Sequence, residues 1–464
     1  MQTQIYLARW STRLVLKKKT KLWQEASDLD QLVERFTIGR DNEFDLILAE
    51  YDVIGSLAHG TMLNHVGLLT SGEWLAIRTE LLILLEQIRS DNFEIESGVE
   101  DIHSQIELVL TRKLGDAGKK IHTGRSRNDQ VLLDLRLYTR VKIRDIVAST
   151  SELFDILITL SDRHKHILMP GYTHTQVAMP SSFGLWFAAY AESLIDDLIQ
   201  VQAAYHIINK NPLGSAAGYG SSLPLDRELT TRLLGFGALN INSLYAQMGR
   251  GKTERVVLSA IASLAETLGR FAADIILFLS QNFAFISFPD TITTGSSIMP
   301  HKKNPDIFEL LRARCNRIRA LPTEINMITA NLSSGYHRDL QILKEMYMPA
   351  LIDLKECLAI MIHILPRIQV SKEILDNTIY RDIYSVEAVN QLVLKGMSFR
   401  DAYHQVKQSV QNVNSKKPDK VLYTHTGSIN NLQNEQIRRA MTDVLQQFEF
   451  TSWQKAIDNL TFKS

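Results

Sequence analysis

Apolar residues recur at helical spacing along several stretches that lack glycine and proline. Residues 125–169 contain neither, and Ile143, Ile146, Val147, Leu153, Phe154, Leu157 and Ile158 fall three or four positions apart. Similar stretches cover residues 185–211, 252–288 with Gly269 alone inside, and 306–321. Each predicts a helix well beyond the usual length of about 11 to 12 residues. Rods of this length pack side by side, so we expect an all-α fold with a long central helical bundle.

The position of the predicted bundle divides the chain into candidate domains. We place a basic extension at residues 1–20, an N-terminal helical domain at 21–112, the central bundle at 113–366 and a C-terminal helical domain at 367–464. Glycine-rich residues 213–220 and residues 291–300 are expected to be loops, and strands to be scarce. One helix carries apolar residues on more than one face, at Val256, Val257, Leu258, Ile261, Leu264 and Leu268. Since one neighbour would not cover them all, bundling between subunits is expected.

Composition narrows the class of protein. The 464 residues include 51 Lys plus Arg and 51 Asp plus Glu, so no net field favours nucleic acid or an anionic membrane. Cys315 and Cys357 are the only cysteines, which excludes a disulfide framework and a multi-cysteine metal site and favours the reducing cytoplasm. The most apolar stretch, residues 275–288, falls short of the roughly 20 residues of a membrane span. No membrane partner is therefore expected.

Three polar segments interrupt the helical pattern. The first contains two arginines, and the second contains a histidine between two threonines. HTGRSRNDQ, residues 122–130, precedes a long helix that Asn128 and Asp129 would cap. The free amides of that helix start, with Arg125 and Arg127, could bind a carboxylate, although a plain cap with solvated arginines is the alternative. GYTHTQ, residues 171–176, is expected to be a loop that presents His174, while a purely structural histidine stays open.

The third segment, TTGSSIMPHKKNPD, covers residues 293–306 from its first threonine and leads into a helix bearing Glu309. Its glycine, two serines and two lysines offer backbone donors, hydroxyls and cationic charge. A phosphate loop is excluded because no second glycine immediately precedes Lys302 and no strand pattern lies upstream. The chain also lacks G-x-S-x-G, H-E-x-x-H and G-x-G-x-x-G, so hydrolase, zinc-protease and dinucleotide-binding interpretations have no support.

These segments carry a family resemblance. The third resembles the signature of the fumarase and aspartase superfamily, whose members eliminate fumarate from a succinyl group. The first two resemble the argininosuccinate lyase branch, as do GYHRDLQILKE at residues 335–345 and PLGSAAGYGSSLPLDR at 212–227. The resemblance covers about residues 40–350. It implies argininosuccinate as the small-molecule substrate and a reaction without metal or organic cofactor.

The resemblance also implies roles for individual residues. Ser296 matches the general base, Lys302 and Asn304 the groups that stabilise a dianionic carboxylate intermediate, and His174 a proton-transfer group with Glu309 as its partner. Whether His174 or a water protonates the leaving guanidinium stays open. The matching substrate-binding residues are Asp45, Arg127, Asn128, Thr173, Arg250, Asn304, Tyr336, Gln341 and Lys344.

The chain departs from the family pattern at three places, the first being that the Gly-Gly-Arg-Phe segment common near the N-terminus of the branch is absent. The usual Asp-Arg-Asp-Phe-like stretch is replaced by residues 249–252, Gly-Arg-Gly-Lys, of which only Arg250 carries over. A serine expected to hold the amino-acid end of the substrate is replaced by Asp41, although Asp45 matches the following aspartate. The handling of the substrate's α-amino group is therefore open, and so is a modified substrate.

Other functions compete with this interpretation. Adenylosuccinate lyase, aspartase and fumarase share the chemistry but differ in substrate, and residues 122–130 and 336–344 favour the arginine branch. A catalytically inert homologue is a second class. A nucleic-acid-binding module has the least support because the zero net charge gives no wider basic surface. Members of the family are homotetramers with sites built from three subunits, so the resemblance implies that Ser296 and His174 of one site come from different chains.

Overall fold

The computed structural model describes residues 31–96, 98–295, 297–411 and 423–462. The expected basic extension at 1–20 and the expected base Ser296 therefore lie outside the described residues. The helices are α1 (Gln31–Ile38), α2 (Asp41–His65), α3 (Ser71–Arg89), α4 (Ile102–Leu114), α5 (Asp116–Lys119), α6 (Arg127–His164), α7 (Phe183–Ile208), α8 (Arg227–Leu233), α9 (Ser243–Met248), α10 (Lys252–Leu279), α11 (Asp306–Ile328), α12 (Leu343–Ile364), α13 (Ser385–Leu394), α14 (Phe399–Gln411), α15 (Asn434–Gln446) and α16 (Phe450–Thr461).

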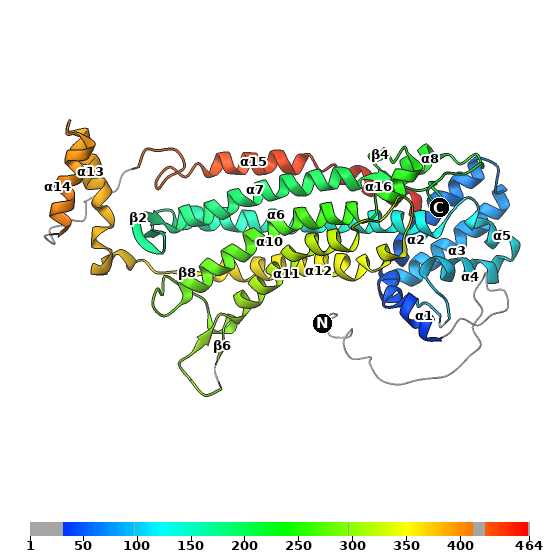
Figure 1. The fold of residues 1–464 in the computed structure, drawn as a ribbon, viewed down its shortest axis with the longest axis horizontal. Coiled ribbons are helices and arrows are strands. Elements are labelled where there is room, and N and C mark those ends of the chain that lie inside the picture. The colour runs from blue at the N-terminus through cyan, green and yellow to red at the C-terminus, as the bar shows by residue number, and fades with distance from the viewer. Residues whose placement is uncertain (1–30, 97, 296, 412–422, 463–464) are drawn as a thin grey trace.

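The long helices α6, α7, α10, α11 and α12 lie side by side and give the molecule its elongated shape (Figure 1). Their facing stripes are buried, with Phe187, Leu264 and Leu358 fully excluded from solvent. The described part of the chain is mostly helical, which confirms the predicted all-α class and the long bundle. A continuous apolar core runs through this bundle and positions the loops at its two ends.

The strands form four short pairs. They are β1 (Leu168–Thr173) with β2 (Gln176–Ser182), β3 (Lys210–Asn211) with β4 (Ala238–Leu239), β5 (Ile286–Ser287) with β8 (Gln369–Val370), and β6 (Thr294–Gly295) with β7 (Lys303–Asn304). All are antiparallel except β3 and β4. The expectation that GYTHTQ is a loop was wrong, because these residues belong to the β1–β2 hairpin.

Two described helices contain an internal proline, and the predicted stretch 252–288 ends as a helix at Leu279. The predicted helix 306–321 continues through Pro322 to Ile328, and α12 contains Pro349. Proline removes one helical hydrogen bond and crowds the preceding turn. Burial of Ile325 beyond Pro322, and of Leu351 and Leu354 beyond Pro349, offsets that cost.

α10 alone among the described helices has the length and hydropathy of a membrane span. Over half of its most apolar window is buried inside the bundle, with Leu258, Ile261 and Ile275 fully covered. A core helix meets the same criteria, and the packing of α10 against α7 and α11 accounts for its composition.

The C-terminal helices are distributed along the length of the molecule. α13 and α14 pack on each other beyond one end of the bundle, α15 lies along α7, and α16 packs against α2 and α8 (Figure 1). The end of α16 thus lies near the N-terminal helices. The division into four domains stays a prediction.

Candidate active site

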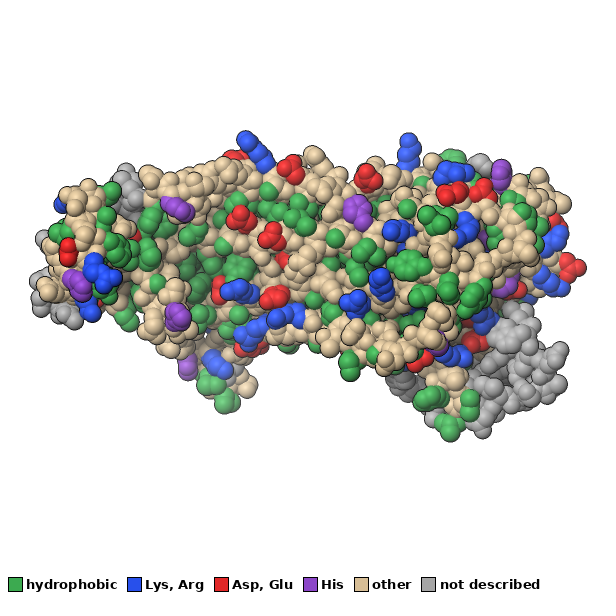
Figure 2. All heavy atoms as spheres, turned by 45° about the horizontal axis from the view of Figure 1, so that its top comes forward, with side chains coloured by type: hydrophobic (Ala, Val, Ile, Leu, Met, Phe, Trp, Pro, Cys, Tyr) green, Lys and Arg blue, Asp and Glu red, His purple; other side chains and the backbone are tan. Residues whose placement is uncertain are grey.

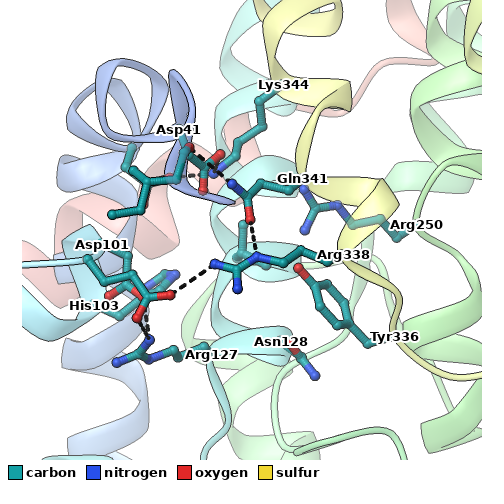
Figure 3. A pocket seen from close by; sticks show the side chains of 14 residues that line it. Asp41, Asp101, His103, Arg127, Asn128, Arg250, Tyr336, Arg338, Gln341 and Lys344 are labelled. Carbon is teal, nitrogen blue, oxygen red and sulfur yellow. Dashed lines mark hydrogen bonds and ion pairs between the residues drawn. The ribbon is translucent and has the colours of Figure 1, made fainter. Parts of the chain in front are cut away.

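A cavity of about 230 Å³ lies at the end of the bundle where α2, α4, α6 and α12 meet (Figure 3). Seven of the predicted substrate-binding residues line it: Asp45, Arg127, Asn128, Arg250, Tyr336, Gln341 and Lys344. Asp41, Glu100, Asp101, His103 and Arg338 complete its polar lining. Segments that are far apart in the sequence are therefore brought together around one cavity.

The start of α6 is held by a capping box rather than by Asn128. The Ser126 hydroxyl accepts the Asn128 amide at 3.2 Å, and the Asp129 carboxylate accepts the Ser126 amide at 2.9 Å. The other Asp129 oxygen accepts the amides of Gly214 and Ala216, each at 3.0 Å, which fixes the glycine-rich loop against the helix. Burial raises the pKa of Asp129 to about 6, although these hydrogen bonds act to lower it. Asn128 is left to face the cavity.

Two guanidinium groups share acidic partners at the mouth of the cavity. Arg127 contacts Asp101 at 2.9 Å and Glu100 at 3.2 Å, and Arg338 contacts the other oxygen of Glu100 at 3.1 Å. Arg127 also donates to the Ser104 hydroxyl at 2.7 Å. These pairs orient both guanidinium groups before any ligand binds. Arg125 points elsewhere, since it donates to the Ser56 hydroxyl at 2.9 Å.

A lysine between two aspartates forms the inner end. The Lys344 ammonium lies 2.6 Å from Asp41 and 2.5 Å from Asp45, and its side chain is only 3% exposed. Asp45 also accepts the Ile102 amide at 3.3 Å, so it ties α2 to the start of α4. Burial and the neighbouring Asp45 raise the pKa of Asp41 to about 6, against the opposing effect of Lys344.

The segment before α12 closes one side of the cavity. The Gln341 amide donates to the carbonyls of Thr37 at 3.0 Å and Ile38 at 3.2 Å, and its oxygen accepts Arg338 at 3.1 Å. Buried Arg250 donates to the Leu340 carbonyl at 3.0 Å. The backbone of residues 336–341 is thereby fixed from both sides.

A buried ionic network lies beneath the cavity. His103 on α4 hydrogen-bonds Asp52 on α2, and Asp134 on α6 lies 3.8 Å from the same ring nitrogen. Burial lowers the pKa of His103, but Asp52 and Asp134 outweigh it and raise the value to about 9. Burial and the charge of Asp52 raise the pKa of Asp134 well above its usual range.

The three side chains of this network could in principle hold a metal ion, because their ligand atoms lie within 4.8 Å of one another. Metal ligation requires a neutral imidazole. The raised pKa of His103 instead favours its protonated form, which donates to Asp52. We therefore interpret Asp52 and His103 as an internal ion pair that supports the cavity floor.

The predicted catalytic histidine lies on the tip of the β1–β2 hairpin. Thr173 pairs with Gln176, and His174 and Thr175 form a two-residue turn with φ of 52° and 60°. Such turns require positive φ at both central positions, where glycine or asparagine is usual. Backbone strain of this kind clusters at functional sites. Thr173 and His174 are both exposed.

The signature segment forms the β6–β7 ribbon and the start of α11. Thr294 pairs with Asn304, and Gly295 with Lys303. Lys302 and Glu309 are exposed, and Asn304 is half-buried. Lys303 forms an ion pair with Asp290, whereas no ion pair of Lys302 occurs within the part of the chain that the structure describes.

The predicted catalytic and binding residues of one chain are therefore far apart. α6 has 38 residues, which at 1.5 Å per residue span roughly 57 Å. Arg127 begins this helix at the cavity, and the hairpin with His174 follows its far end (Figure 1). The β6–β7 ribbon lies beyond the far end of α10, whereas Arg250 precedes its start. Seven predicted binding residues are brought together, and Thr173, His174, Lys302, Asn304 and Glu309 are not among them.

The comparisons with known proteins agree with this fold. A family model described as "Lyase" matches residues 25–320. An EDDS lyase variant with bound fumarate has a TM-score of 0.70 at 21% identity and covers 92% of this chain and 93% of its own. A fumarate lyase:delta crystallin from Brucella melitensis, in a cobalt-bound crystal structure, has a TM-score of 0.68 at 14% identity, with 89% and 91% covered. These findings define a lyase of the fumarase and aspartase superfamily.

Sequence relatives narrow the class further. Argininosuccinate lyase from Phocaeicola vulgatus is 55% identical over 94% of this chain and 98% of its own, and that from Parabacteroides distasonis is 56% identical over the same shares. The Thermotoga neapolitana enzyme is 41% identical over 83% of this chain and 97% of its own. The chain belongs to the argininosuccinate lyase family, which confirms the resemblance found in the sequence.

Sequence reasoning missed several residues of the cavity. His103 and Asp101 were not singled out, because a polar residue at a helix start gives no signal by itself, and Arg338 lies in the quoted segment 335–345 but was given no role. The Glu-Asp pair at residues 100–101, just before a helix with a histidine in its first turn, is the feature that could have drawn attention to them.

Proposed function

We propose that this chain eliminates fumarate from argininosuccinate and leaves arginine, as a carbon–nitrogen lyase. The observation that carries the proposal is the convergence of seven family-matched binding residues on one cavity. The near-complete coverage of argininosuccinate lyases at 55% identity supports the same substrate. The cavity offers both carboxylates and cations, which suits a substrate with carboxylates, an ammonium and a guanidinium group.

The chemistry starts with the loss of a proton from the carbon beside a carboxylate of the succinyl group. Negative charge then accumulates on that carboxylate, and a nearby ammonium and amide donors lower the barrier. We assign the charge stabilisation to Lys302 and Asn304 and proton removal to Ser296. The C–N bond then breaks, its electron pair stays on the guanidinium nitrogen, and fumarate leaves. His174, with Glu309, or a water supplies the proton that this nitrogen takes up.

We further propose that each site combines the two ends of different chains in a homotetramer. Within one chain, the length of α6 separates His174 from the cavity, so the hairpin of a second copy would have to complete the site. Exposed apolar side chains on the bundle support such assembly: Ile199, Leu277, Leu310 and Met327 are 45 to 70% exposed. Figure 2 shows hydrophobic side chains gathered along the exposed side of the central helices. Contact with another copy would remove such exposed apolar side chains from water.

The cytoplasm is the compartment that we propose for this enzyme. Cys315 and Cys357 are free and buried, as expected for a protein kept in a reducing environment.

Fumarate release from purified protein tests the proposed reaction. Absorbance of fumarate is followed with argininosuccinate, adenylosuccinate and aspartate as separate substrates. The proposal predicts turnover of argininosuccinate at least about 100-fold faster than of the others, because the cavity groups match its arginine half. Turnover of adenylosuccinate instead, or none at all from protein shown to be folded and tetrameric, would reject it in favour of a sister lyase or an inert homologue.

A further inference from the structure

Asp41 is the departure from the family pattern that the proposed reaction does not use. It occupies the first position of α2, one helical turn before Asp45, and lines the cavity. Its carboxylate lies 2.6 Å from the Lys344 ammonium, on the same nitrogen that Asp45 contacts at 2.5 Å. The side chains of Asp41, Asp45 and Lys344 are 17%, 3% and 3% exposed.

The charges at this end of the cavity do not balance. Two carboxylates share one ammonium, and Arg250, whose charge also acts on Asp41, has its own acid in Glu254 at 3.5 Å. Arg40 pairs with Glu43 at 2.8 Å. Among the residues that the structure describes, one negative charge therefore remains, and the raised pKa of Asp41 reflects burial and the repulsion between the two acids. Of the two acids, Asp41 is the more exposed to the cavity.

A free α-amino acid group fits this arrangement. Its ammonium would meet Asp41, and its carboxylate would meet Lys344, so the two charges of the ligand cancel and the net charge at this end of the cavity does not change. Acylation would turn that ammonium into a neutral amide with a single donor. The carboxylate of the acylated ligand would then add a second uncompensated negative charge to this end of the cavity, and Asp41 would lose a cationic partner, at the cost of a poorly solvated carboxylate.

We propose that Asp41 makes this site selective for substrates with a free α-amino group and against their Nα-acyl derivatives. This inference rests on the proposed function for the identity of the reacting half. It resolves the question that the sequence left open, since a second acid at this position disfavours a modified amino group.

The test compares kcat/KM for argininosuccinate and Nα-acetylargininosuccinate. The unmodified protein should prefer the free amine by at least about 100-fold, because the analogue leaves a buried charge unpaired. Asp41→Asn and Asp41→Ser should each reduce this preference at least about tenfold, through a higher KM for the free amine. Glu43→Gln is the matched control, since Glu43 is on the same turn but is 48% exposed and pairs with Arg40. An equal preference in Asp41→Asn and the unmodified protein overturns the inference.

Calorimetric binding of L-arginine and Nα-acetyl-L-arginine separates this inference from the proposed function. If argininosuccinate is not turned over but arginine binds better than its acetyl derivative in an Asp41-dependent way, the reaction fails and the selectivity stands. If turnover is present and neither the kinetic nor the binding preference depends on Asp41, the selectivity fails alone. Circular dichroism of both variants and their Glu43→Gln control shows whether each is folded.

Discussion

The two ends of the bundle differ in how completely one chain builds them. At the cavity, Arg127, Arg338, Asp45 and Lys344 are all fixed by ion pairs to partners on other segments. At the far end, His174 is exposed on a two-residue turn. The chain thus orders the end that we propose to bind substrate by itself and leaves exposed the end that we propose to be catalytic.

This difference separates stability from catalysis. Substitutions in the buried network at the cavity should lower the free energy of unfolding, whereas substitutions at the far end should reduce turnover and leave the fold intact. The predictions below test that contrast, starting with the largest effect.

The Asp52→Ala variant should lose about 3 to 5 kcal/mol of unfolding free energy, because it leaves a buried, protonated His103 without its partner. The exposed His174→Asn variant should stay within about 0.5 kcal/mol of the unmodified protein, since asparagine tolerates the positive φ of this turn. Urea denaturation of both variants provides the measurement. Similar losses in the two variants would remove the contrast between the two ends.

The Lys302→Ala variant should reduce kcat about 100- to 1000-fold, equivalent to about 3 to 4 kcal/mol, without changing Tm. Lys303→Ala is the matched control, because its neighbouring ammonium is paired with Asp290. Steady-state kinetics with argininosuccinate measure the effect. If the two variants lose activity equally, Lys302 has no special role.

The pH dependence of stability should show the ion pair of His103. Its folded pKa of about 9 exceeds the ordinary 6.5, so its contribution is fully present below pH 6.5 and is lost as pH rises through 9. Unfolding free energies measured from pH 6 to 9.5 should therefore fall, and fall less steeply in His103→Gln. An identical slope in both proteins would show that His103 is not charged in the folded state.

The sequence predicted the long helices because uninterrupted apolar spacing over residues such as Ile143 to Ile158 leaves few other structures. It failed where a local signal and the packing disagree, as at Pro322 and at the His174 turn. Motifs identified most of the cavity, including the segment that contains Arg338, but not His103, whose position depends on how distant helices pack. Ser296 lies outside the described residues, so its role stays a prediction.

The most direct test of sites shared between chains mixes two inactive variants. Asn128→Ala alters the cavity and His174→Asn the far end, and neither wild-type side chain is part of the ion-pair network described above. After subunit exchange, confirmed by native mass spectrometry, random mixing should restore about a quarter of the activity. A site works only when its cavity comes from a His174→Asn chain and its hairpin from an Asn128→Ala chain, and each of these has a probability of about one half. Mixing Asn128→Ala with Tyr336→Ala, both at the cavity, should restore none. Absence of recovery in the first mixture, despite confirmed exchange, would contradict the shared site.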